Sequence, residues 1–445
     1  MKRPSFIKYS VFIMVVCILL IMSCGKVHHY ELSRFVSPET CGGCHDEIYS
    51  QWKGSLHSLS HKDEIYRAVA LNDIKGITDP DELAEAELCV KCHTPVGYVS
   101  GYPLRTSDDH SKVKEIAREG IQCDFCHSST GAKKLYNAMI TLRPGWGEEY
   151  PGIKRGPFFD SKSDYHGSAY SKFHTTSEVC AVCHDVRHVV FGTKLETPYE
   201  EWKAGPYNNC DPEKRVTCQG CHMYHRPGFP ATGSTPRPEN PGRATPDGPK
   251  RDHIFTHYFV GGNSFTPPRH GSRLHSDMAV ERLKNAAELS INTDTIDEGI
   301  ITVTVRNTGA GHKLPTGLTD VRQMWLEVTV RNNHGRILYK SGHQNTNGYL
   351  GAEAIIYHTV FGDGTGKPVR NLAKARQVLK DNRIPPGGKV EEKFLLPAGV
   401  RGDLNVSVRL LYRLAPQRIV DRIMGRNAPR LPVVEMNSVR VTASR

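Results

Sequence analysis

Residues 41–45 are Cys41-Gly42-Gly43-Cys44-His45, and the pattern Cys-x-x-Cys-His returns at 89–93, 123–127, 180–184 and 218–222. This spacing is the attachment signal for c-type haem. Each thiol forms a thioether to one vinyl group of the same porphyrin, and the adjoining histidine binds the iron. A zinc site needs four ligands and does not need a histidine directly after the second cysteine. The five copies therefore predict five covalently bound haem c groups.

The motifs account for most of the 13 cysteines in the chain. The predicted thioether residues are Cys41, Cys44, Cys89, Cys92, Cys123, Cys126, Cys180, Cys183, Cys218 and Cys221. The predicted proximal iron ligands are His45, His93, His127, His184 and His222. Cys17 and Cys24 belong to an apolar leader and its end, which leaves only Cys210 without a predicted role.

The N-terminus has the pattern of an export signal. Three basic residues precede an apolar run over 11–22, which is shorter than the roughly 20 residues that a membrane span needs. We predict a signal peptide over 1–23 and a tether over 24–40. The ending Ile21-Met22-Ser23-Cys24 resembles a bacterial lipobox and predicts lipidation of Cys24, with ordinary cleavage nearby as the alternative. The protein is then exported, either periplasmic or an outer-membrane lipoprotein, with the cell surface also open.

The formal net charge of +11 does not indicate nucleic-acid binding. Without the three basic leader residues the charge is +8, and the ten propionates of five haems would bring it to about −2. We therefore expect no nucleic-acid partner. Only 38% of the residues are hydrophobic, which is low for this length, so the haem macrocycles are expected to form part of the core.

The composition changes along the chain and predicts several regions. Residues 41–225 form the haem-bearing domain, with short helices such as 63–71 and 80–88 between loops. Residues 226–250 hold seven prolines and four glycines, so 226–275 are predicted to be a long loop that could also supply iron ligands. A connecting helix is expected over 276–290, with its apolar residues at Met278, Leu283, Ala286, Ala287 and Leu289.

From residue 291 the hydrophobic period changes to two, which is typical of half-buried strands. Alternating stretches occur at 301–306, 324–330, 337–339, 390–396, 404–412 and 438–442, with a turn at 332–335. Several such strands predict an immunoglobulin-like β-sandwich over 291–445. The predicted fold class is α+β multidomain, with a mainly α/loop multihaem domain followed by this sandwich. We interpret the β-domain as a docking or structural module.

The first part of the chain resembles the tetrahaem cytochrome c-554 family, which is related to the octahaem hydroxylamine oxidoreductase and tetrathionate reductase group. The first motif is followed by Trp52 and His57, as in that family's CxxCH…W…H pattern. Gly120 stands three residues before Cys123, and Phe173-His174 precedes the fourth motif, both as in the family. The resemblance covers roughly residues 38–190. It leaves out the fifth motif and the β-domain.

The resemblance implies sixth iron ligands. His57 and His174 match family distal histidines, and His166 is expected to match a third. It also implies an open iron at the haem on Cys89 and Cys92, although His110 or His61 could close it here. The fifth haem has no counterpart in the family, and His225, His257, His253 and His188 compete for it. The loop Gly311-His312-Lys313-Leu314-Pro315-Thr316-Gly317 could reach a haem or a metal, but we interpret it as a strand connection.

Closely spaced haems with two imidazoles each are suited to single-electron transfer, since their ligands stay the same in both oxidation states. The first hypothesis is therefore an exported electron carrier between a donor and an acceptor protein, in respiration or extracellular electron transfer. The second is an enzyme that reduces a small nitrogen or sulfur oxyanion at a five-coordinate haem, with the second motif as the candidate. The third is a subunit of a cytochrome filament. No catalytic residue is predicted, the enzyme question stays open, and an oligomer is allowed.

Overall fold

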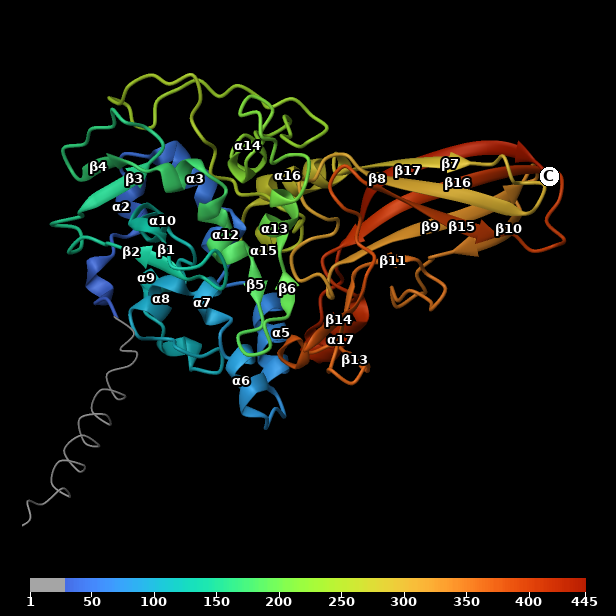
Figure 1. Ribbon diagram of the computed structural model, residues 1–445, viewed down its shortest axis with the longest axis horizontal. Helices are drawn as coiled ribbons and strands as arrows, with labels where there is room; N and C mark the ends of the chain where they lie inside the picture. The colour runs from blue at the N-terminus through green and yellow to red at the C-terminus, as the bar shows by residue number, and fades with distance from the viewer. Residues whose placement is uncertain (1–28) are drawn as a thin grey trace, which may run out of the picture.

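The computed structural model describes residues 29–445, so the predicted signal peptide and Cys24 lie outside the described residues. Figure 1 shows a helix-and-loop part, from blue to yellow-green, beside an elongated part built from strands, from yellow to red. The chain is therefore α+β, as predicted, with its helices and its long strands separated along the sequence. In the described part of the chain, no helix combines the length and the apolar character needed to cross a bilayer.

The helix-and-loop part consists of short elements. Its helices are η1 (Leu32–Arg34), α2 (Pro38–Gly42), α3 (Asp46–Lys53), α4 (Leu56–Leu59), α5 (Glu64–Ile74), α6 (Pro80–Ala86), α7 (Val90–His93), α8 (Pro95–Val99), η2 (His110–Lys112), α9 (Glu115–Arg118), α10 (Cys123–His127), α11 (Lys172–Thr175), α12 (Glu178–His184), α13 (Pro198–Lys203) and α14 (Cys218–His222). Three two-stranded sheets lie among them: β1 (Ser129–Ala132) with β2 (Ile140–Leu142), β3 (Ile153–Gly156) with β4 (Gly167–Tyr170), and β5 (Val186–Arg187) with β6 (Lys194–Glu196).

Two predicted helices are confirmed with small shifts at their ends. The helix α5 begins after Asp63, whose carboxylate accepts a hydrogen bond from the Tyr66 backbone N–H at 2.9 Å. The helix α6 begins after Asp79, with Pro80 in its first position. Asp at the N-cap and Pro just inside it are ordinary start signals, because both suit backbone groups that lack a helical partner.

The Pro/Gly-rich segment (residues 226–275) has little regular structure, as predicted. It contains only the short helix α15 (Thr266–Arg269) and a few isolated bridges, such as Asn240 with His253. Figure 1 shows its first half as a long loop over the top of the helix-and-loop part. This segment therefore lies on the haem-bearing region and does not extend away from it as a linker.

The predicted connecting helix ends earlier than expected. The helix α16 covers Arg273–Lys284, and Asn285 caps it with a hydrogen bond to the Arg282 carbonyl. Residues 287–289, predicted to be helical, belong to the first long strand, β7 (Ala287–Asn292). The prediction was wrong at this end because Ala286, Ala287 and Leu289 fit both an apolar helix face and the start of an alternating strand.

The strand-rich part contains two large antiparallel sheets. The first has the order β15-β8-β7, and the second has β10-β9-β16-β17 with β11 also paired to β9. Their strands are β8 (Ile300–Asn307), β9 (Gln323–Asn332), β10 (Ile337–Ser341), β11 (Ile356–Tyr357), β15 (Lys389–Leu395), β16 (Asp403–Arg413) and β17 (Val434–Ser444). All six alternating stretches of the sequence coincide with strands, and Gly335 closes the predicted turn at a φ of +79°.

The inward side chains of the two sheets form one core. In β8 the buried residues are Ile301, Val303 and Val305, with Thr302 and Thr304 facing outward. They pack in the same cluster as the buried side chains of β9 and β16, including Leu326 and Val408. Burial of one side chain in every two is the arrangement that a period of two predicts for paired sheets.

A third, small sheet was not predicted. It has the order β13-β12-β14, formed by β12 (Thr359–Gly362), β13 (Pro368–Val369) and β14 (Gln377–Asp381). The helices η3 (Leu372–Lys374), α17 (Gln417–Met424) and η4 (Gly425–Asn427) complete this part. Ile65 of α5 packs in one buried cluster with Val420 of α17, so the two parts of the molecule share apolar contacts.

The sandwich core predicts the effect of truncating its side chains. Leu326 is 0% exposed in β9, whereas Leu395 of β15 is 70% exposed. We expect Leu326→Ala to lower the free energy of unfolding by about 2–5 kcal/mol, because it removes buried methyl groups and leaves a cavity. The exposed Leu395→Ala serves as the control, with a change within about 0.5 kcal/mol. Urea unfolding followed by circular dichroism measures both, and equal losses would contradict a core centred on β9.

Candidate functional site

The five Cys-x-x-Cys-His motifs lie on short helices or at their ends. The first begins in the last turn of α2 and places His45 at the N-cap of α3, and the second begins with Cys89 at the N-cap of α7 and ends at the last residue of that helix. The last three fall in α10, α12 and α14, each of which ends at the motif histidine. One helical turn brings both thiols and the imidazole to the same side of the backbone, as attachment to one porphyrin requires.

Four motif histidines point one ring nitrogen at a backbone carbonyl. The Nδ1-to-oxygen distances are 2.7 Å from His45 to Ala244, 3.1 Å from His93 to Ser60, 2.6 Å from His127 to Arg155 and 3.1 Å from His222 to Val260. A carbonyl can only accept, so Nδ1 carries the proton and Nε2 keeps a free lone pair. A metal-binding imidazole usually donates its other N–H to a carbonyl in this way, which fixes the orientation of its ring.

Other imidazoles lie opposite the motif histidines at a regular spacing. The ring centroids are 6.5 Å apart for His45 and His166, and 6.1 Å apart for His184 and His57. Two imidazoles that bind one metal ion from opposite sides, with bonds of about 2 Å, have centroids roughly 6 Å apart. These two pairs therefore fit an iron between them.

His127 has two imidazoles at a comparable spacing. The centroid of His174 lies 5.8 Å away and that of His257 lies 6.4 Å away. Both ring nitrogens of His174 already have partners, because Nε2 is 3.0 Å from the Cys126 carbonyl and Nδ1 is 2.8 Å from the Ser171 hydroxyl. His257 places Nδ1 at 2.9 Å from the Phe255 carbonyl, which leaves its Nε2 available. The geometry therefore favours His257 opposite His127.

His312 lies near the fifth motif, although its loop was expected to be only a strand connection. Its Nδ1 is 3.0 Å from the Lys313 carbonyl, so its Nε2 is available. Burial lowers the pKa of His312, and the electrostatic influence of its ring contributes to lowering the pKa of His222 and of His184. His312 is therefore an imidazole of the strand-rich part that reaches the haem-bearing region. The dense Gly311–Gly317 turn sequence was the feature that had pointed to a possible contact between this loop and a haem.

His93 has a different neighbour from the other motif histidines. The Tyr66 ring stacks on it, with centroids 3.5 Å apart and planes within 4°. In the part of the chain that the structure describes, no imidazole pairs with His93 at the spacing seen above. His61 and His110 lie 5.3 Å from one another instead, and His61 hydrogen-bonds the Thr94 hydroxyl through Nδ1.

Three histidines considered for the fifth haem have other partners. His225, which we expected to bind iron, has Nδ1 at 3.1 Å from Arg282 and Nε2 at 3.2 Å from Glu281, so neither nitrogen is available. His188 is 2.9 Å from the Ala373 carbonyl and accepts two backbone N–H groups. His253 stacks on a tyrosine ring at 3.6 Å. Both nitrogens of His225 have partners here, so it is a weaker candidate for the fifth haem, and its position near the fifth motif serves Arg282.

Burial keeps three of the paired imidazoles neutral. It lowers the pKa of His57 and of His127 to about 3, with neighbouring histidines adding to the shift, and it lowers the pKa of His257 to about 4. A protonated imidazole cannot bind a metal, because both of its nitrogens are donors. At neutral pH these rings are therefore in the form that binds iron.

The motif cysteines approach one another across the sequence. The thiols of Cys41 and Cys123 lie close enough to influence one another's pKa, as do those of Cys92 with Cys183 and of Cys180 with Cys218. Cys126 lies close enough to Cys180 to influence it electrostatically. The first motif is therefore next to the third, and the third is next to the fourth. The fourth motif is also next to the second and to the fifth.

A buried ion pair joins the His312 loop to α13. The Glu201 carboxylate accepts a hydrogen bond from the Lys313 backbone at 2.9 Å and from Arg383 at 2.8 Å. The side chains of Glu201 and Arg383 are only 7% and 6% exposed. Asp381 also pairs with Arg383 and with the Lys313 ammonium group. These contacts hold the His312 loop against the haem-bearing region.

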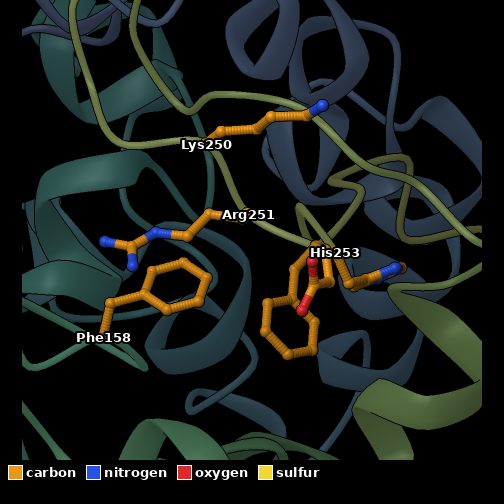
Figure 2. Close-up of a pocket in the computed structure, with 6 residues that line it drawn as sticks. Phe158, Lys250, Arg251 and His253 are labelled. Atoms are coloured by element: carbon orange, nitrogen blue, oxygen red, sulfur yellow. The ribbon is translucent and has the colours of Figure 1, made fainter.

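One pocket of about 390 Å³ lies on the Pro/Gly-rich segment (Figure 2). It is lined by Phe158, Lys250, Arg251, Asp252, His253 and Phe255. The Arg251 guanidinium lies 4.3 Å from the Phe158 ring centroid and pairs with both carboxylate oxygens of Asp160. Because Arg251 already has partners and His253 is stacked, we assign no ligand to this pocket.

The Glu201 contacts predict a stability effect. We expect Glu201→Ala to lower the free energy of unfolding by about 3–5 kcal/mol, because it leaves Arg383 buried without one of its carboxylates. Glu391 provides the comparison, since its pair with Lys389 is exposed and screened by solvent, so Glu391→Ala should leave the unfolding midpoint nearly unchanged. Thermal unfolding of the two variants measures the difference. A Glu201 variant as stable as the Glu391 variant would show that the ion pair does not hold the two parts together.

Comparisons with known proteins give a family match and a similar fold. Residues 40–128 match a family model described as cytochrome c554 and c-prime. The fold resembles a penta-heme cytochrome c552 from Thermochromatium tepidum, with a TM-score of 0.61 and 20% sequence identity over 93% of this chain and 100% of that chain. No curated protein matches the chain. The family match supports c-type cytochrome character for residues 40–128, and the structural match shows a shared fold over most of the chain.

Proposed function

We propose that the protein is an exported c-type cytochrome with five haems that transfers single electrons between redox partner proteins. The observation that carries the proposal is the set of imidazoles facing motif histidines at the spacing of a shared iron. A haem bound at each motif supplies reversible one-electron chemistry. The chain fixes the two axial nitrogens in place, so the ligands need not change between the oxidation states.

We propose four bis-histidine sites. Three have the ring spacing described above: His45 with His166, His184 with His57, and His127 with His257. The fourth, His222 with His312, is proposed from the available Nε2 of His312 and its electrostatic influence on His222. His174 remains the competitor at the third site, because its ring is close although both nitrogens have partners. His312 is preferred to His225 at the fifth site because Nε2 of His312 is available, whereas both nitrogens of His225 have hydrogen-bond partners.

The thiol contacts support a branched order of the sites. The Cys41/Cys44 site connects with the Cys123/Cys126 site, and that site connects with the one on Cys180/Cys183. From there one branch leads to the Cys89/Cys92 site and the other to the Cys218/Cys221 site. Cys44 is the most exposed of the motif cysteines, which makes the first site the natural contact for a partner protein.

The strand-rich part has a proposed structural role. An immunoglobulin-like topology fits its two antiparallel sheets around one core. Its position supports assembly of the fifth site, because it carries His312. The proposed export, lipidation of Cys24 and attachment to a membrane rest on the leader sequence. The proposed partners are an electron donor and an electron acceptor protein, and an oligomer is also allowed.

A second function is favoured by one observation. His93 faces no second imidazole within residues 29–445, so an iron at Cys89/Cys92 would have an open position. The Tyr66 hydroxyl is buried there without a hydrogen-bond partner among the described residues, and burial raises its pKa. An open iron with a nearby phenol fits reduction of a small oxyanion, with the other sites supplying electrons.

Low-temperature electron paramagnetic resonance of the oxidised protein, with a carbon monoxide difference spectrum of the reduced form, separates the two functions. Five low-spin irons without a carbon monoxide adduct would leave only electron transfer. One high-spin iron in five that binds carbon monoxide would support the enzyme. A haem content other than five, measured as the pyridine haemochrome, would contradict the proposal itself.

Substitution of distal histidines tests the assignments. We expect His257→Ala and His312→Ala each to convert one further low-spin iron to high spin, because each removes an axial nitrogen. His174→Ala is the matched comparison for His257→Ala and should leave the number of low-spin irons unchanged. The same paramagnetic resonance spectra measure all three variants. If His174→Ala gave the high-spin signal and His257→Ala did not, the two residues would exchange roles.

A further inference from the structure

Arg282 is an unusual residue beside the fifth motif. It extends from α16 and donates hydrogen bonds to two backbone carbonyls, that of Cys221 at 2.8 Å and that of Ala231 at 3.2 Å. The same guanidinium lies 3.1 Å from Nδ1 of His225, which is neutral and accepts. Its Nε is buried without a partner in the described part of the chain. No carboxylate of residues 29–445 forms an ion pair with Arg282.

An arginine inside a protein normally has an anionic partner, because desolvation of the charge is otherwise uncompensated. Burial lowers the pKa of Arg282 to about 10, which still leaves it fully charged at neutral pH. On the other side of His225, the Glu281 carboxylate contacts Nε2 at 3.2 Å and accepts from the Gly228 backbone N–H. His225 therefore separates the guanidinium from the carboxylate, and the pair is compensated only at a distance.

The positive charge of Arg282 acts on both proposed axial ligands of the fifth site, His222 and His312. After burial, Arg282 is the largest influence that lowers the pKa of His222, and it also contributes to the lowered pKa of His312. Arg237 is a second cation near Cys221. The guanidinium, which donates to the Cys221 carbonyl at 2.8 Å, therefore lies beside the fifth motif, in surroundings that screen its charge weakly.

We propose that Arg282, held by His225 and Glu281, raises the reduction potential of the haem bound at Cys218 and Cys221. A fixed positive charge disfavours the oxidised iron, which carries one more positive charge than the reduced iron, and therefore favours the reduced state. Arg282 is a positioning residue in this role, since it acts through space and does not bind the iron. The proposal rests on the proposed fifth haem and adds a direction: electrons that reach the fourth site are drawn towards the fifth.

The test is a spectroelectrochemical titration of the holoprotein. In Arg282→Met one of the five redox components should shift to lower potential, while the other four stay unchanged. In Arg282→Lys, which keeps the charge, that component should stay closer to its wild-type potential. Arg273→Met is the matched control, because Arg273 lies on the same helix with its side chain 90% exposed to screening solvent.

Glu281→Gln gives a second and opposite readout. Removing the carboxylate leaves the guanidinium less compensated, so the same component should shift to higher potential. Glu281 is only partly buried, so this variant should fold even where Arg282→Met does not retain its haems. A Glu281→Gln titration without a shift, or with a downward shift, would overturn the proposal. So would an Arg282→Met protein with five haems and an unchanged titration.

These outcomes are distinct from failure of the proposed function. The haemochrome and the masses of the haem-bearing peptides show, before any titration, whether Cys218 and Cys221 carry a haem. The component that shifts should be the one whose resonance signal changes in His312→Ala. A shift in a different component would also overturn the assignment of Arg282 to the fifth site.

Discussion

The hydrogen bond from a motif histidine to a backbone carbonyl is the constraint on which the rest of the structure depends. An imidazole fixed through Nδ1 must offer Nε2 to the iron, so the carbonyl sets the direction of the metal bond. Two of the four acceptors, Ala244 and Val260, belong to the Pro/Gly-rich segment. A regular helix or strand would have used these carbonyls within its own backbone. The irregular segment is therefore what allows one stretch of chain to orient two distant motifs.

The described part of the haem-bearing region has only small apolar clusters and lacks a continuous core. Phe35, Val96, Phe125 and Leu142 form one of them, and the others are of similar size, whereas the strand-rich part has one large continuous core. A region of nearly two hundred residues cannot be stabilised by such clusters alone. The proposed macrocycles would supply the missing apolar surface, which explains why the sequence is lean in hydrophobic residues.

The sequence predicted the elements that follow a local rule. Attachment motifs, N-caps at Asp63 and Asp79, and strands with a period of two depend on neighbouring residues and could be recognised directly. The pairing of distant histidines could not, because it depends on how loops cross in space. His225 illustrates the limit: its nearness in sequence to the fifth motif suggested a ligand, but Arg282 and Glu281, more than fifty residues later, occupy both of its nitrogens. The small sheet β12–β14 was missed for a similar reason, since its strands are too short to show a period.

The His312 loop connects the strand-rich part with the proposed fifth site. It is fixed to α13 through Glu201 and to β14 through the pair of Lys313 with Asp381, so the strand-rich part cannot move without disturbing the fifth site. Arg282 approaches the same site from α16, the helix that joins the two parts of the molecule. The proposed ligand His312, the charged Arg282 and the connecting helix α16 therefore all lie at the fifth motif. The proposed fifth site takes residues from the helix-and-loop part and from the strand-rich part, so it is complete only when the two parts are packed together. Electron transfer from the fourth site to the fifth would therefore depend on correct folding of both parts.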